Sequence, residues 1–261
     1  MERFDVRAAD LRVINSATKY PSIPTYHALD PRNGTLRDEV TAFTGDVIGT
    51  EKVDGTNSRI VQLPDGTWLL GSREELLYAE GDLIGNPSQG IVEALKPVAA
   101  RLPALAEGDL MRAYYLELYG GKIGARAKQY TADGRSVGWR LFDVAVVDYA
   151  EVARRSPEQI SRWRDEGGQQ YSDEADLAEL AAAAGLELTP RLFTLGAADL
   201  PSGIAGTKEF LDLRAPSSRC VLDAAAAGGA EGIVLRTPDR SVIAKARFQD
   251  YERTLRRRPG R

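Results

Sequence analysis

The sequence has few of the residues that most catalytic and metal sites use. In 261 residues there is one cysteine, Cys220, and one histidine, His27. A single cysteine excludes an intramolecular disulfide framework. A single histidine excludes a histidine-rich zinc site and leaves any Ser-His-Asp arrangement dependent on His27 alone. We therefore expect catalysis to rely on Lys, Arg, Asp and Glu, with Cys220 and His27 in structural roles.

Long apolar runs and strong net charge are also missing. No segment reaches the length of a transmembrane helix, and the start, Met1-Glu2-Arg3-Phe4-Asp5, is charged rather than signal-like. These features predict a cytoplasmic protein. The formal net charge of -4 gives no overall attraction to nucleic acid, so a polyanion site must be a local patch.

Hydrophobic periodicity and turn residues predict a mixture of strands and helices. The first fifty residues read as loop-rich, residues 253–261 as a frayed basic tail, and Pro97 as a kink or break in a helix. The order of elements predicts an α+β fold with mainly antiparallel sheets flanked by helices. The expected strands are 58–63, 67–70, 111–119, 139–147, 232–236 and 242–247, and the expected helices are 89–102, one from Ser156-Pro157-Glu158, 173–184 and 217–227.

The stretch Glu51-Lys52-Val53-Asp54-Gly55-Thr56-Asn57 lies between two expected strands. A lysine in such a loop faces a cavity when the glycine lets the backbone approach it, and a lysine amine becomes a nucleophile when desolvation or nearby cations lower its pKa. The alternative is a surface hairpin, since Val-Asp-Gly-Thr is ordinary turn chemistry.

More polar groups follow at the ends of later strands, in a fixed order. Taken singly, these acids and cations are typical of solvated strand ends, and an aromatic within an apolar strand is typical of a core. Their joint order favours a shared site instead. The groups are Ser72-Arg73, Glu117, Phe142-Asp143, Glu231, and the pair Lys245 and Arg247.

Together these motifs resemble the ordered set of the covalent nucleotidyltransferases, the superfamily of ATP-dependent DNA and RNA ligases and mRNA capping enzymes. The resemblance covers residues 19–250. DNA ligases and capping enzymes usually have an arginine at the place of Asn57. Glu-Lys-x-x-Gly-Thr-Asn is instead similar to the RNA ligase family that seals double-stranded RNA, as is the early segment Lys19-Tyr20-Pro21-Ser22-Ile23.

The resemblance implies an adenylyltransferase (RNA ligase catalytic) domain over residues 1–250, with an ATP-grasp-like ligase core, followed by a basic C-terminal tail at 251–261. Many family members carry a further domain after the last motif. This sequence ends within about fifteen residues of Arg247, too few for a folded domain, so we expect no OB domain.

The resemblance also implies a mechanism. Lys52 would attack the α-phosphorus of ATP and hold AMP, and Lys245 and Arg247 with Mg²⁺ or Mn²⁺ would stabilise the charge on the phosphates. Glu231 is the first expected metal ligand, and Glu117 would reach either the ribose or a metal-bound water. The AMP would pass to an RNA 5′-phosphate, and a 3′-hydroxyl would then displace it.

The remaining expected contacts concern the base and the RNA. Phe142 would stack on adenine, Val234 would floor the same pocket, and Glu51 would contact the base edge. Asn57 and Arg73 would act near the α-phosphate or the RNA ends, and Arg236 at the RNA 5′-phosphate. One departure is Arg247, where the family usually has a lysine, because arginine clamps phosphate as a planar fork.

Other functions stay open from the sequence. They are a DNA ligase, a capping-type nucleotidyltransferase, and an adenylate-carrying module that needs a protein partner for end recognition. We expect a monomer that acts on RNA with 5′-phosphate and 3′-hydroxyl ends.

Overall fold

The computed structural model describes residues 9–79, 82–85, 90–105, 110–124, 126–224, 226 and 228–257. The chain divides into two compact units, each built from three stretches of sequence. Unit 1 comprises residues Met1–Pro21, Gly55–Leu118 and Trp139–Leu188. Unit 2 comprises residues Ser22–Asp54, Tyr119–Gly138 and Thr189–Arg261.

Unit 1 contains a seven-stranded sheet in the order β10-β9-β8-β4-β5-β6-β7. The pairs β10/β9, β8/β4, β4/β5, β5/β6 and β6/β7 are antiparallel. The strands are β4 (Thr56–Gln62), β5 (Trp68–Ser72), β6 (Leu76–Ala79), β7 (Asp82–Leu83), β8 (Met111–Gly120), β9 (Val137–Val147) and β10 (Gln170–Tyr171).

The helices of unit 1 begin and end where their sequences provide caps. Helix α4 has a capping box between Ser156 and Gln159 with Pro157 in the first turn, and α5 starts after Asp173 and ends at Gly185 in the left-handed region. Helix α2 packs on β4 and β5, and α1 packs on α3 and α4. The helices are α1 (Leu11–Ala17), α2 (Ile91–Ala99), α3 (Tyr149–Val152), α4 (Pro157–Asp165) and α5 (Glu174–Ala184).

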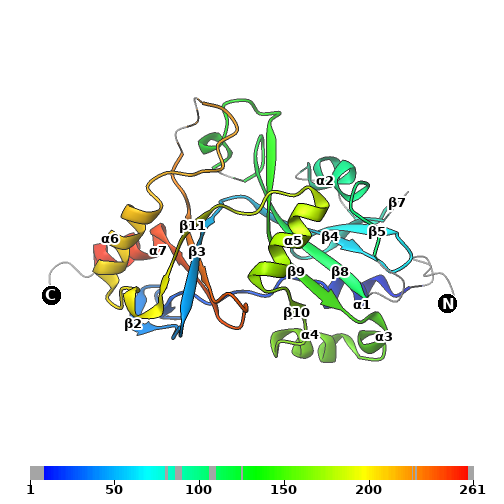
Figure 1. Ribbon diagram of the computed structural model, residues 1–261, viewed down its shortest axis with the longest axis horizontal. Helices are drawn as coiled ribbons and strands as arrows, with labels where there is room; N and C mark the ends of the chain where they lie inside the picture. The colour runs from blue at the N-terminus through cyan, green and yellow to red at the C-terminus, as the bar shows by residue number, and fades with distance from the viewer. Residues whose placement is uncertain are drawn as a thin grey trace. The chain divides into compact units, whose positions relative to one another are not determined.

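Unit 2 contains a four-stranded antiparallel sheet in the order β11-β3-β12-β13 and a small antiparallel pair, β1 with β2. Helices α6 and α7 pack on each other and on β2 (Figure 1). The elements are β1 (His27–Leu29), β2 (Leu36–Val40), β3 (Asp46–Lys52), β11 (Arg191–Gly196), β12 (Gly232–Arg236), β13 (Ile243–Arg247), α6 (Ile204–Arg214), α7 (Phe248–Arg257) and the short 3₁₀ turns Ala127–Gln129 and Ala197–Asp199.

One face of the four-stranded sheet builds the core of unit 2. Alternate residues of the central strands point to this face, and they meet Leu211 of α6 and Tyr251 of α7. The other face is therefore left for polar side chains. The sheet residues in the core are Val47, Ile233, Leu235, Ala244 and Ala246.

His27 and Cys220 are both buried, as the sequence predicts for structural residues. His27 is fully buried, and its ring nitrogens lie 2.8 Å from the Tyr251 hydroxyl and 3.0 Å from the Ser202 carbonyl oxygen. Burial lowers the pKa of His27 below its ordinary value, which favours the neutral ring. Cys220 belongs to a small apolar cluster with Tyr119 and Tyr130.

All six expected strands are present, with ends that differ by at most two residues, but the helical predictions are less accurate. The segment 217–227 was expected to be helical, and its described residues form an irregular loop instead. Helices α1, α3 and α6 were not predicted. Helix α7 extends to Arg257, so residues 253–257 are helical rather than frayed. Residues 258–261 lie outside the described part of the chain, as does position 89, where α2 was expected to begin.

The lysine motif does not form a surface hairpin. Strand β3 ends at Lys52 and pairs with β11 and β12, whereas β4 begins at Thr56 and pairs with β5 and β8. The chain therefore leaves one sheet and enters another across Val53–Gly55. Pro97 lies in the last turn of α2, which continues for two more residues to Ala99. The proline therefore does not divide the helix. Across the described ranges, no helix combines the length and apolarity that crossing a bilayer would need.

The close packing of Phe193 on Gly49 gives a test of this sheet. A Cβ at Gly49 would lie 2.1 Å from the Phe193 ring, which also packs edge-on against Phe210. We expect Gly49→Ala to lower the free energy of unfolding by about 1–3 kcal/mol through overpacking, measured by urea unfolding. Gly229→Ala is the matched control, since nothing lies within 4 Å of the added Cβ. Equal stability of the two variants would contradict this packing.

Candidate active site

The face of the unit 2 sheet opposite the core carries most of the predicted catalytic cations. Residues directly opposite one another in antiparallel strands share a face. Lys52 pairs with Gly232, which pairs with Arg247, and the next row on the same face is Thr50, Val234 and Lys245. Sequence positions 52, 245 and 247 are thus brought onto one surface, with Val234 between them.

Lys52 and Glu231 form the central contact of this surface. The Lys52 Nζ lies 2.5 Å from a Glu231 carboxylate oxygen, and their side chains are 23% and 14% exposed. The backbone fixes both partners, because the Glu231 N–H donates to the Lys52 carbonyl at 3.2 Å and the Phe248 N–H donates to the Glu231 carbonyl at 3.1 Å. The pair is sheltered yet still open to a ligand.

Gly232 lies between Lys52 of β3 and Arg247 of β13 and allows β12 and β13 to pack closely. A Cβ at this position would lie 2.0 Å from the Ala246 carbonyl oxygen, so a larger residue would push β12 away from β13. The glycine also leaves no side chain between Lys52 and Arg247 in their shared row. With about 4.8 Å between neighbouring strands, the Cα atoms of these two residues are about 10 Å apart.

Arg247 is held in place by Asp250, a residue that the sequence analysis did not single out. The Arg247 Nε donates to one Asp250 oxygen at 2.8 Å and Nη2 donates to the other at 3.2 Å. Arg253 donates to the same carboxylate at 2.6 Å and to the Gly34 carbonyl. Asp250 is 1% exposed, so a buried acid fixes the orientation of a predicted phosphate-binding arginine.

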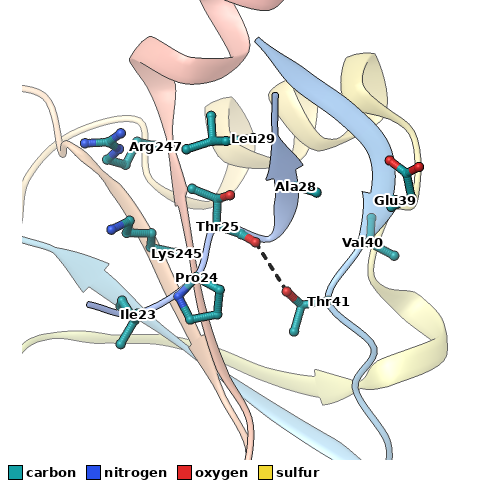
Figure 2. A pocket seen from close by; sticks show the side chains of 10 residues that line it. All are labelled: Ile23, Pro24, Thr25, Ala28, Leu29, Glu39, Val40, Thr41, Lys245 and Arg247. Carbon is teal, nitrogen blue, oxygen red and sulfur yellow. Dashed lines mark hydrogen bonds between the residues drawn. The ribbon is translucent and has the colours of Figure 1, made fainter. Parts of the chain in front are cut away.

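Lys245 and Arg247 line a pocket of about 450 Å³ at the outer edge of β13 (Figure 2). The segment around Thr25 lies beside β13 and forms another part of the pocket wall. The Lys245 N–H donates to the Pro24 carbonyl at 2.9 Å, and the Tyr26 N–H donates to the Lys245 carbonyl at 2.8 Å. Thr41 donates to the Thr25 carbonyl at 3.2 Å. Two cations and the hydroxyl groups of Thr25 and Thr41 therefore border one open space, and Glu39 is the acid that lines it.

Glu51 lies on the other face of β3, in register with Ile233. It is 1% exposed, and its two oxygens accept hydrogen bonds from the Ser218 hydroxyl and from the Arg219 N–H at 2.7 Å. The carboxylate thus replaces helical hydrogen bonds for this segment, which explains why the predicted helix at 217–227 is absent. The expected contact of Glu51 with a base edge stays a prediction.

Tyr130 anchors the loop that follows Lys52. The Asp54 N–H donates to the Tyr130 hydroxyl at 2.6 Å, and the Asp54 carboxylate lies 3.5 Å from Arg126. Burial raises the pKa of Tyr130, so the hydroxyl stays protonated at neutral pH. Asp54 therefore supports the loop through its backbone N–H and its contact with Arg126.

Arg236 lies on the face of the unit 2 sheet that carries Lys52, Lys245 and Arg247, at its buried end. It pairs with Ile48 and Ile243 and is 2% exposed. Its expected role at an RNA 5′-phosphate stays a prediction, and in this structure its guanidinium is not on the surface.

The other predicted site residues lie in unit 1, and Asn57, Glu117 and Phe142 share one face of its sheet. Asn57 of β4 pairs directly with Glu117 of β8. Two residues earlier on the same face of β8 is Tyr115, whose ring stacks on Phe142 with centroids 6.2 Å apart. Phe142 is half-buried and so retains exposed ring surface.

Tyr20 explains part of the early segment that resembles the family. Its ring meets Phe142 edge-on with centroids 4.9 Å apart, and its hydroxyl donates to Asp143 at 2.9 Å. Asp143 is fully buried. Tyr20 therefore positions Phe142, and the motif Phe142-Asp143 has one partly open and one buried member.

Arg73 is exposed at the end of β5, and Arg59 holds its backbone. The Arg59 Nη1 donates to the Arg73 carbonyl at 3.2 Å, and Nη2 donates to Asn15. Arg59 is 1% exposed, and burial lowers its pKa to about 10. A charged residue inside the apolar run 58–63 was the sequence signal for this contact.

The carboxylates present fit a loosely held divalent ion. Within the described ranges, no three His, Cys, Asp or Glu residues are close enough to form a metal cluster. Mg²⁺ binds through one or two carboxylates plus substrate phosphates and keeps several waters. Glu231 contacts Lys52 and precedes Gly232, which pairs with Arg247, so it matches this mode of binding, whereas Glu117 belongs to unit 1.

Comparison with known proteins identifies the family. The family model described as RNA ligase matches residues 45–248 of the 261-residue chain. The chain therefore belongs to the RNA ligase family. No curated protein matches it.

Solved structures share the fold at low identity. A mutant of the Naegleria gruberi RNA ligase with ATP and Mn has a TM-score of 0.51 and 14% identity, covering 94% of this chain and 63% of that one. The same ligase with PPi has a TM-score of 0.51 and 14% identity, and the match covers 92% of this chain and 64% of the ligase. An archaeal ATP-dependent RNA ligase has a TM-score of 0.50 and 17% identity, and the match covers 91% of this chain and 50% of the ligase.

These comparisons support the predicted class of fold. The chain is a mixed structure of α-helices and antiparallel sheets similar to the nucleotidyltransferase folds of RNA ligases. It spans between half and two thirds of the length of these ligases.

The role of Asp250 can be tested by stability. We expect Asp250→Asn to lower the free energy of unfolding by about 1–3 kcal/mol, because two arginines lose a buried charged acceptor. The measurement is urea unfolding. Asp212→Asn is the control, since Asp212 forms an exposed pair with Lys208 in α6 and should cost about 0.5 kcal/mol or less. A cost for Asp250→Asn no larger than for this control would contradict the clamp.

Proposed function

We propose that the chain is an ATP-dependent RNA ligase that joins RNA 5′-phosphate and 3′-hydroxyl ends through a covalent lysyl-AMP. The observation that carries the proposal is Lys52 paired with Glu231 on the sheet face that also presents Lys245 and Arg247. Family membership supports the same reaction. The finer parts of the proposal are an ATP-grasp-like arrangement of the core and a preference for ATP over other nucleotides.

Lys52 acts as the nucleophile. Its Nζ forms a bond to the α-phosphorus of ATP and loses a proton, while the bond from that phosphorus to the oxygen bridging to the β-phosphate breaks and pyrophosphate leaves with the electron pair. This reaction divides one difficult transfer into easier steps. An RNA 5′-phosphate oxygen then takes the AMP from Lys52, and a 3′-hydroxyl finally displaces AMP.

Glu231 holds the nucleophile in place before the reaction. Its carboxylate accepts a hydrogen bond from the Lys52 ammonium at 2.5 Å. The same carboxylate would hold a divalent ion, which when bound would neutralise charge on the phosphates.

Lys245 and Arg247 stabilise negative charge that develops on the phosphates. Both line the same pocket, and their nitrogen ends point to the same side of β13 (Figure 2). Because Asp250 already fixes the guanidinium of Arg247, little reorganisation accompanies the reaction. The residues of unit 1 complete the proposal: Phe142 stacks on adenine, Glu117 reaches the ribose or a metal-bound water, and Asn57 and Arg73 contact the α-phosphate or RNA ends.

The nucleophile gives the first functional test. Incubation with ATP labelled on the α-phosphate and with Mg²⁺ is expected to leave label on the denatured protein, and Lys52→Ala is expected to abolish it because the variant lacks the nucleophilic amine. Lys208→Ala, which removes a half-buried lysine of α6 that pairs with Asp212, should keep the label. Labelling of Lys52→Ala at the normal rate would refute the assignment. A nicked RNA duplex and a single-stranded 5′-phosphate RNA, tested in parallel, then measure which ends are joined.

Glu51 gives a test of base selection. Glu51→Gln is expected to reduce the preference for ATP over GTP in lysyl-nucleotide formation by about tenfold, the effect of one hydrogen bond to a charged group. Ser218→Ala removes one partner of Glu51 but keeps the carboxylate, so it should retain the preference. The measurement is kcat/KM for each nucleotide. An unchanged ratio in Glu51→Gln would contradict the base-edge role and leave Glu51 only as the anchor of residues 218–219.

A further inference from the structure

A second hollow lies in unit 1, outside the face that carries Asn57, Glu117 and Phe142. Its volume is about 530 Å³, within the range of ligand pockets. The end of α3 and one side of α4 form its walls. Residues Arg154, Arg155, Gln159, Arg162, Trp163, Glu166, Gly167 and Gly168 line it.

This hollow is lined by positive charge, and part of that charge has no acidic partner among the described residues. Three arginines and one acid, Glu166, line it. Within the described residues, the exposed side chains of Arg154 and Arg162 have neither a hydrogen-bond nor an ion-pair partner. Arg155 is paired with Glu151. Two guanidinium groups are therefore available to bind an anion, although the chain as a whole is acidic.

Trp163 adds an aromatic surface among these arginines. The tryptophan is half-buried, and its indole is held by the backbone, since a Cβ on Gly168 would lie 2.1 Å from the indole nitrogen. The Arg155 guanidinium carbon lies 5.8 Å from the ring centroid. A fixed indole beside arginines is the combination that binds single-stranded nucleic acid, with guanidinium groups on phosphates and aromatic rings against bases.

We infer that this hollow is an accessory binding site for single-stranded RNA. Arg154 and Arg162 contact backbone phosphates, and Trp163 packs against a base. The occupant is RNA rather than an acidic peptide because the aromatic surface serves an unpaired base, whereas a peptide needs only the charges. The inference rests on the proposed function, since RNA is the substrate of that reaction. It adds a contact that lies outside the motifs of the nucleotidyl transfer.

The experiment compares RNA binding with adenylylation in the same proteins. Binding of a fluorescent single-stranded 5′-phosphate RNA is followed by anisotropy at several salt concentrations. The double variant Arg154→Ala/Arg162→Ala should weaken binding about tenfold at low salt. Its slope of log affinity against log salt should fall by about 1.4, since each phosphate contact on a single strand contributes about 0.7. Label transfer to Lys52 from ATP alone should be unchanged, which also shows that the variant is folded.

The control is Arg101→Ala/Arg135→Ala, which removes the same charge from two other exposed arginines. It should bind RNA within about twofold of the original protein. If both double variants lose the same affinity and slope, the effect is general charge and the inference fails. It also fails if Arg154→Ala/Arg162→Ala binds RNA normally.

Trp163 supplies an independent readout. RNA binding should quench tryptophan fluorescence in the original protein and in Trp68→Phe, but much less in Trp163→Phe, because a stacked base quenches only the indole it touches. Equal quenching in all three proteins would contradict a base at Trp163. Loss of Lys52 labelling in the original protein would instead contradict the proposed function, and RNA binding at α4 would still be measured by anisotropy.

Discussion

The short contact between Lys52 and Glu231 is the interaction on which the site depends. Lys52 is the last residue of β3, and Glu231 directly precedes β12, the strand that pairs with β3. Backbone hydrogen bonds hold both residues in place. An amine and a carboxylate so close together satisfy each other in the resting protein. Lys245 and Arg247 lie on the same sheet face as Lys52, so the cations of the proposed site are gathered on one surface.

The sheet of unit 2 separates stability from reactivity by alternation. One set of residues, including Val47, Ile233 and Ala246, faces α6 and α7 and forms the core. The other set presents Lys52, Lys245 and Arg247. The site is then completed by contacts behind the reactive side chains. Asp250 fixes Arg247, and Tyr130 fixes the loop after Lys52.

Much of this site could be predicted from particular residues. The alternation Ala244-Lys245-Ala246-Arg247 places both cations on one face of a strand, and the strong strands at 111–119 and 232–236 follow from their apolar, β-branched or aromatic residues. The pairing of strands could not be predicted, because β3 meets β12 from about 180 residues further along the chain. Short-range patterns contain no information about that choice.

The errors have specific physical causes. Residues 217–227 look helical by composition, but Glu51 supplies the hydrogen bonds for a loop there. Helix α7 buries Asp250, Tyr251 and Thr254, so its inner face lacks the apolar repeat that identifies a helix. Asp250 itself was recognisable only after α7 was known, because its spacing of three residues from Arg247 becomes meaningful on a helical turn.

The central claim is that one amine, selected by its surroundings, carries the nucleotide. Peptide mapping by mass spectrometry after incubation with ATP and Mg²⁺ tests it most directly. The account predicts one added AMP, located on the peptide that contains Lys52 and removed by acid, which cleaves a phosphoramide. An adduct located on Lys245, or spread over several lysines, would contradict it.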